Sequence, residues 1–158
     1  ALAFRAAGAA GLFMAEPAAG LISPNSLARF SSAPIRQIIS SVQREDFAII
    51  YHNCGARLVH LPRILEAGAD IYHFGQPMDL PNALVMADGK SILCGNLDPA
   101  GVFLTGSDQE VAEKTRALLE SCRSHRNFIP SSGCDLPTVV PLANMAAFYR
   151  TVREGLQG

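Results

Sequence analysis

The chain alternates between short apolar runs and longer segments in which apolar residues recur every three or four positions. The apolar runs predict five buried β-strands, over residues 11–15, 47–51, 70–74, 91–94 and 127–131. Each run is followed by a segment with the apolar stripe of an amphipathic helix. The strand and helix pairs repeat at roughly 25 to 35 residues, the size of a βα unit, so the pattern predicts an α/β fold.

Several of the expected helices carry a clear first residue. Ser23 followed by Pro24 predicts an N-cap with proline at the first helical position. Asp79 predicts the cap of a helix over 80–87, and Ser107 with Glu110 predicts a capping box for the longest helix. A final helix begins near residue 141, and six of its apolar residues are predicted to face inward: Leu142, Met145, Phe148, Tyr149, Val152 and Leu156.

Polar and metal-binding residues gather where the predicted strands end. The strands are mainly apolar, which is typical of a parallel sheet buried on both faces. Both α/β barrels and doubly wound sheets build their sites at the carboxyl ends of such strands. Seven unusual residues fall there: Glu16, His52, Cys54, His73, Asn96, Asp98 and Cys134. Five units are too few to close an eight-stranded barrel, so a barrel segment of this size leaves two edge strands for a missing part or another chain to cover.

The strongest chemical signal is the pair His52 and Cys54. Side chains of a strand alternate between its two sides, so these two point the same way and Asn53 points the other way. Imidazole and thiolate are favoured zinc ligands, and Cys134 adds a second thiolate if the fold brings distant strand ends to one rim. The resulting site has one nitrogen, two sulfurs and an open fourth position. Glu16 is a candidate fourth ligand, or a partner of one.

Each of the other candidates has a structural alternative. Buried free cysteines are common, and Cys94 and Cys122 lie within apolar patterns that favour a place in the core. His73 is a candidate for substrate binding if it lines a pocket, and the alternative is that it packs against its neighbours. Asn96 and Asp98 are candidates for substrate binding, but such residues commonly cap a helix or shape the turn that enters it.

Composition narrows the classes of partner. The 158 residues hold 13 basic and 14 acidic side chains without a basic cluster, which argues against a nucleic-acid surface or an anionic membrane as partner. No stretch approaches the roughly 20 apolar residues of a membrane span. The four cysteines could form two disulfides, but a chain with this large a core does not need them, so reduced thiols in the cytoplasm are expected. Because the chain begins at Ala1 without a Met, we expect a fragment or a processed protein.

Three ordered motifs resemble the C-terminal part of the uroporphyrinogen decarboxylase superfamily. They are His52-Asn53-Cys54-Gly55, Gly95-Asn96-Leu97-Asp98-Pro99 and Ser132-Gly133-Cys134-Asp135. Within the superfamily, the chain is most similar to the cobalamin-dependent, coenzyme M-type methyltransferases. The resemblance implies a TIM barrel of which residues 1–158 supply the last five βα units, as one partial domain.

In that methyltransferase branch, an H-x-C motif and a later cysteine bind zinc, which is similar to His52, Cys54 and Cys134 here. The resemblance therefore implies that these residues hold a zinc ion that activates a small thiol. The thiol then takes a methyl group from methylcobalamin on a corrinoid partner protein.

The decarboxylase branch gives the alternative function. It shares the GNLDP-like turn, works without a metal and lacks the H-x-C pair. It also has a glycine-histidine-glycine-like turn where this chain has Gly133-Cys134-Asp135. The rival expectations are thus decarboxylation of a tetrapyrrole, or a relative that binds a corrinoid without catalysis.

Overall fold

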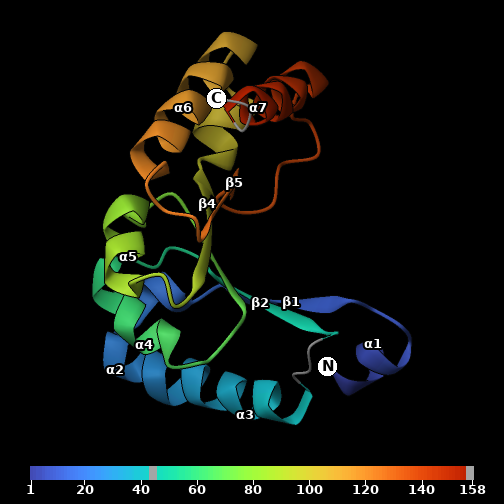
Figure 1. Ribbon diagram of the computed structural model, residues 1–158, viewed down its shortest axis with the longest axis vertical. Helices are drawn as coiled ribbons and strands as arrows, with labels where there is room; N and C mark the ends of the chain where they lie inside the picture. Colours follow the sequence, from blue (N-terminus) through green and yellow to red (C-terminus); the bar gives the residue numbers. More distant parts are fainter. Residues whose placement is uncertain (43–45, 156–158) are drawn as a thin grey trace.

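A parallel sheet of five strands forms the centre of the computed structural model, which describes residues 1–42 and 46–155 (Figure 1). The strands are β1 (Gly11–Glu16), β2 (Ala48–Asn53), β3 (Ile71–Phe74), β4 (Ile92–Leu97) and β5 (Phe128–Ser132). They lie side by side in chain order, and all four pairings are parallel. A doubly wound sheet reverses its order part-way, whereas a barrel does not. The order therefore confirms the predicted segment of a TIM barrel.

The helices follow the strands as the sequence predicts. In chain order they are α1 (Leu2–Ala6), η1 (Ala19–Leu21), α2 (Pro24–Leu27), the π-helical η2 (Ala28–Ser32), α3 (Ala33–Val42), η3 (Leu58–His60), α4 (Leu61–Leu65), α5 (Leu80–Ala87), the π-helical η4 (Pro99–Leu104), α6 (Asp108–Cys122) and α7 (Leu142–Gly155). Ser23 accepts an N-cap hydrogen bond from the Ser26 amide of α2 at 3.2 Å, and Asp79 accepts one from the Asn82 amide of α5 at 3.3 Å. Ser107 and Glu110 form the predicted capping box at α6.

The inner face of α7 differs from the prediction. Leu142 and Tyr149, predicted to face inward, are 80% and 60% exposed. Leu156 lies outside the described residues. Buried positions on this helix are Asn144, Ala147, Phe148 and Thr151. The Asn144 amide donates hydrogen bonds to two backbone carbonyls, each at 2.8 Å, so a polar residue holds a place that hydrophobicity alone assigns to leucine.

One face of the sheet carries the main core. Tyr51, Tyr72 and Leu93 on three neighbouring strands pack in one cluster with residues of α2, α4 and α5. Figure 1 shows α4 and α5 along this side of the strands and α6 with α7 beside β4 and β5. Burial of these side chains removes a large apolar area from water and so stabilises the packing of the helices on this face of the sheet.

The opposite face is only partly covered within the described residues. Phe13, Ile92 and Ile129 lie on it and are 50%, 38% and 40% exposed. In a closed barrel this face lines the interior, where layers of side chains fill the centre. In residues 1–42 and 46–155, no helix is long and apolar enough to cross a membrane.

Candidate metal centre

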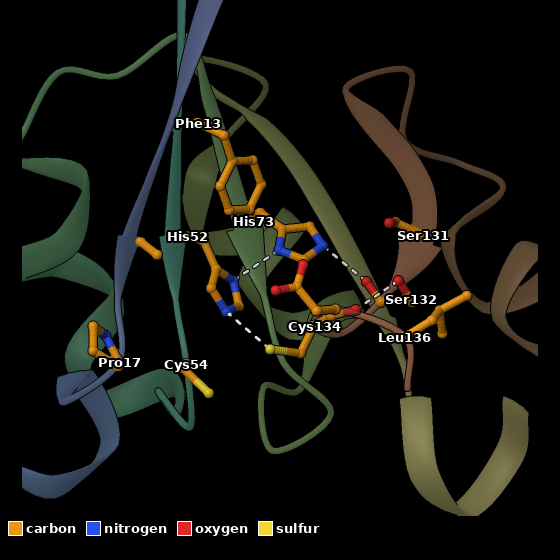
Figure 2. Close-up of a pocket in the computed structure, with 11 residues that line it drawn as sticks. Phe13, Pro17, His52, Cys54, His73, Ser131, Ser132, Cys134 and Leu136 are labelled. Carbon is orange, nitrogen blue, oxygen red and sulfur yellow. Dashed lines mark hydrogen bonds between the residues drawn. The ribbon is translucent and has the colours of Figure 1, made fainter. Parts of the chain in front are cut away.

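Three of the predicted ligands meet at the carboxyl end of the sheet. The ligand atoms offered by His52, Cys54 and Cys134 all lie within 4.8 Å of one another. His52 is only 4% exposed, whereas both cysteines are partly accessible. All three line an open cavity of about 450 Å³. Figure 2 shows the two sulfurs and the His52 ring converging at this cavity.

His52 and Cys54 are placed by the end of β2 and the turn that follows it. The Cys54 amide donates to the Glu16 carbonyl at 3.1 Å, which extends the pairing of β1 and β2 by one residue. Gly55 then turns the chain with a φ of +69°, a conformation that favours glycine. Gly20 donates to the Cys54 carbonyl at 3.0 Å and packs so closely that a Cβ on it would collide with the Gly55 backbone. The segment after β1 therefore holds the turn that carries Cys54 in place through a hydrogen bond and a close backbone contact.

Cys134 reaches the site through a second close backbone contact. Gly133 donates to the Leu97 carbonyl at 2.6 Å. A Cβ on Gly133 would lie 2.9 Å from the Gln76 nitrogen and 3.0 Å from the Gly75 Cα, so only glycine allows this approach without a shift. The loop after β5 thus lies against the loop after β3, and the Cys134 sulfur comes to 3.6 Å from His52 Nε2.

A second imidazole stands behind the first. His73 is paired with His52 across β2 and β3, and their Nδ1 atoms are 2.7 Å apart. The other nitrogen of His73, Nε2, lies 2.8 Å from the Ser132 carbonyl oxygen. The Phe13 ring stacks on His52 at 5.7 Å between centroids and meets His73 edge-on at 5.6 Å. Both imidazoles are therefore fixed by packing and by hydrogen bonds (Figure 2).

The electrostatics favour uncharged side chains at this site. Burial lowers the pKa of His52 and of His73, an effect that their hydrogen bonds and the Asp135 carboxylate partly oppose. Burial also raises the pKa of the Cys54 thiol, and the neighbouring Cys134 adds to this. Neutral imidazole is the form that binds metal, and a thiol with a raised pKa ionises readily only beside a cation.

The donor set fits zinc in type and spacing. In tetrahedral coordination, with Zn–S of about 2.3 Å and Zn–N of about 2.0–2.1 Å, the nitrogen and sulfur ligands are about 3.6 Å apart. His52 Nε2 and Cys134 Sγ have this separation, 3.6 Å. Three protein ligands beside an open cavity are typical of catalytic zinc, which keeps one position for substrate or water.

Glu16, predicted as a fourth ligand, does not join this group. Its strand partner is Asn53, so its side chain lies on the helix-covered face of the sheet. There its carboxylate accepts hydrogen bonds from Ser31 Oγ at 2.5 Å and from the Ala18 amide at 3.1 Å. The prediction placed Glu16 at the correct strand end but on the wrong face, because the sequence does not show how β1 and β2 are aligned.

The predicted substrate residues have local partners instead. Asn96 donates to the Gly75 and Met78 carbonyls at 3.2 and 2.6 Å, which holds the loop after β3. Asp98 caps η4 by accepting from the amide two residues later at 2.9 Å. Neither of them lines the cavity at the metal centre, whereas His73 does. The structural alternatives stated for Asn96 and Asp98 are the ones that the geometry favours.

Part of the cavity wall was not predicted. It includes Phe13, Pro17, Ser131 and Leu136. Phe13 could have been found from the strand pattern. Side chains two positions apart on a strand share a face, so Phe13 lies on the same face as Ala15, which also lines the cavity. Ser131 lies on β5, and nothing in the strand pattern marks it as a site residue, whereas Pro17 and Leu136 lie outside the strands, where the periodic pattern does not describe the path of the chain.

Residues 1–155 match the sequence model described as uroporphyrinogen decarboxylase (URO-D). The chain belongs to the URO-D family. This confirms the resemblance that the three ordered motifs indicated.

Relatives within the URO-D family have two kinds of name. A uroporphyrinogen decarboxylase of Paraburkholderia phytofirmans is 27% identical over 94% of this chain and 41% of its own length. The methylcobamide:CoM methyltransferase MtbA of Methanosarcina acetivorans is 24% identical over 70% of this chain and 31% of its own. The chain thus spans less than half the length of these relatives.

A solved structure of a methyltransferase from Methanosarcina mazei superimposes on 96% of this chain with a TM-score of 0.83. The two sequences are 21% identical, and the chain covers 44% of that structure. This similarity establishes the fold and agrees with a partial URO-D barrel.

Proposed function

We propose that this chain carries the zinc centre of a URO-D-family methyltransferase, which moves a methyl group from methylcobalamin on a corrinoid protein to a small thiol. The observation that carries the proposal is the convergence of His52 Nε2 and the sulfurs of Cys54 and Cys134 within 4.8 Å. The similarity to proteins named methylcobamide:CoM methyltransferase supports it.

The proposed ligands leave room for a small substrate. A zinc ion held by His52, Cys54 and Cys134 would stabilise a substrate thiol as its thiolate at neutral pH. In the transfer, the thiolate electron pair forms the new S–CH₃ bond while the bond from methyl carbon to cobalt breaks. The electron pair of that broken bond stays on cobalt, and the thiol proton passes to solvent.

The remaining residues of the cavity act on orientation and water. Phe13 and Leu136 give it an apolar wall, which limits water around a thiolate and so preserves its nucleophilicity. The cavity is open, which is necessary if the methyl donor is carried by a second protein. Because the proposed ligands need cysteines that are not oxidised to disulfides, and Cys54 and Cys134 form none, we place this chemistry in the reducing cytoplasm.

A metal-free decarboxylase of tetrapyrroles is the second candidate. The similarity to named uroporphyrinogen decarboxylases over 94% of the chain favours it. A non-catalytic relative that binds a corrinoid is a third. Both alternatives predict that Cys54 and Cys134 can be replaced without loss of function.

The test is methyl transfer from methylcobalamin to a thiol by the protein that carries this chain, with Cys54→Ser compared to Cys94→Ser. Cys94 is a matched control because it is half-buried on β4, outside the three-residue group. We expect the first variant to lose at least about 100-fold in rate and the second to keep it, since loss of a mere supporting contact already costs about 10–100-fold. Equal rates in both variants, or full activity after complete removal of metal, would contradict the proposal.

A further inference from the structure

We propose that His73 is a positioning residue that holds His52 in the tautomer with its proton on Nδ1, so that Nε2 presents a lone pair to the metal. The inference rests on the proposed zinc centre for its purpose. The assignment of the tautomers rests on the hydrogen bonds that link three groups in series: the Ser132 carbonyl, the His73 ring and the His52 ring.

The direction of the series is set at its far end. The Ser132 carbonyl oxygen can only accept a hydrogen bond, and His73 Nε2 lies 2.8 Å from it. His73 Nε2 must therefore carry a proton. In a neutral imidazole only one nitrogen is protonated, so His73 Nδ1 has a free lone pair.

The contact between the two imidazoles also fixes the position of a proton. His52 Nδ1 lies 2.7 Å from His73 Nδ1, a distance that requires one proton between the two atoms. Because His73 supplies the lone pair, His52 Nδ1–H is the donor. The other tautomer of His52 would place two lone pairs against each other at this distance. His52 Nε2 is thus left unprotonated, 3.6 Å from the Cys134 sulfur.

The two rings have little freedom to leave this arrangement. His52 and His73 are 4% and 6% exposed and occupy paired positions on adjacent strands. Their centroids are 4.7 Å apart, and Phe13 contacts both rings. Second groups that orient a metal-bound histidine typically change metal affinity by about 10–100-fold when removed. Both nitrogens of His73 are used within the chain, so it serves His52 and does not bind substrate.

The test begins with the metal-free protein. Long-range ¹H–¹⁵N spectra of the imidazoles report which nitrogen of each ring carries the proton. We expect His52 as the Nδ1–H tautomer and His73 as the Nε2–H tautomer. A metal-free wild-type protein with His52 protonated on Nε2 would overturn the inference, and this measurement needs no variant to fold.

Two substitutions then test the purpose. His73→Leu removes both hydrogen bonds, whereas the amide of His73→Gln can accept from His52 and donate to Ser132. We expect zinc affinity to fall about 10–100-fold in His73→Leu and to recover to within about 3-fold of wild type in His73→Gln. His125→Leu, on the loop before β5, is the control and should keep wild-type affinity. Equal affinities for the Leu and Gln variants would overturn the positioning role.

The two proposals can fail separately. A protein that holds the expected tautomers but binds no zinc supports the hydrogen-bonded series and removes the proposed function. A protein that binds zinc through His52 with the opposite tautomer in its metal-free state keeps the proposed function and removes this inference.

Discussion

Two polar clusters lie on opposite faces of the sheet at the carboxyl ends of β1 and β2. On the helix-covered face, Ser31 Oγ lies 2.5 Å from both the Glu16 carboxylate and the Tyr51 hydroxyl. On the open face, His52 lies with Cys54 and Cys134 around the cavity. Tyr51 and His52 are neighbours in the sequence, yet they belong to different clusters.

The difference between the clusters lies in what their polar atoms bind. The Glu16 carboxylate is occupied by Ser31 and by the backbone of the following turn, so its chemistry is used to hold η2 and the loop after β1. The sulfurs of Cys54 and Cys134 and the Nε2 of His52 instead converge within 4.8 Å of one another beside the cavity. A polar residue at a strand end therefore acts in structure or in a site according to the face that it occupies.

The largest expected effect comes from removing a ligand on the open face. His52→Ala and Cys54→Ser should each weaken zinc binding by more than about 100-fold, since even a supporting group is worth about 10–100-fold. Glu16→Gln should leave the affinity unchanged. Competition with a chromophoric zinc chelator measures all three. A loss of affinity in Glu16→Gln equal to that of the other two would return Glu16 to the ligand set.

The second prediction concerns the apolar part of the open face. We expect the 158-residue chain to associate with itself, because Ile92 and Ile129 are exposed on the open face and the sheet of the described residues ends in two edge strands, β1 and β5. Ile129→Lys should weaken association by roughly 10–100-fold, which corresponds to burial of one such side chain at about 1.5–3 kcal/mol. Val85→Lys, on the outer surface of α5, is the control.

Light scattering over a range of concentrations measures this association. A wild-type chain that stays monomeric and unfolds cooperatively would contradict the picture of an uncovered barrel interior.

On the covered face, substitution should alter stability without altering metal binding. Glu16→Ala removes the acceptor of two hydrogen bonds and should lower the free energy of unfolding by about 1–3 kcal/mol. Glu16→Gln keeps an acceptor oxygen and should cost less. Urea unfolding gives the free energies, and a Glu16→Ala protein as stable as wild type would show that the cluster has no structural importance.

The smallest effect is expected at the loop that carries Cys134. In Gly133→Ala the new Cβ would press on the backbone of Gln76 and Gly75, so the loop must shift by a few tenths of an ångström. We expect zinc affinity to fall roughly 10-fold, within the range of about 1–3 kcal/mol for overpacking. Gly89 has a φ of +68°, so Gly89→Ala strains the backbone, but the new Cβ meets no atom within 4 Å; this control should lower stability and leave zinc affinity unchanged. Equal zinc affinity in both variants would show that the loop contact does not position Cys134.

Local patterns predicted most of the fold. The helix α5 begins and ends where Asp79 and the apolar spacing indicate, and the capping box at α6 forms as expected. β2 and β4 run two and three residues further than predicted, because their polar ends still pair with the neighbouring strands. Hydrophobic pattern marks the apolar part of a strand and misses such a continuation.

The candidate site was predictable only in part. Period two placed His52 and Cys54 together, but Cys134 joined them on the strength of fold topology and resemblance. The face on which Glu16 lies and the contact of His73 with His52 both depend on how neighbouring strands are aligned. Alignment is a property of two segments together, so neither segment alone predicts it. Without that alignment, the sequence could not separate a ligand from a structural carboxylate.

The proposed zinc centre on the open face consists of His52, Cys54 and Cys134. The most direct test is the zinc content of freshly purified protein, measured for the wild type and for Cys134→Ser by elemental analysis. We predict about one equivalent in the wild type and loss of most of it in the variant. Less than about half an equivalent in the wild type, with no further loss in Cys134→Ser, would contradict the metal centre.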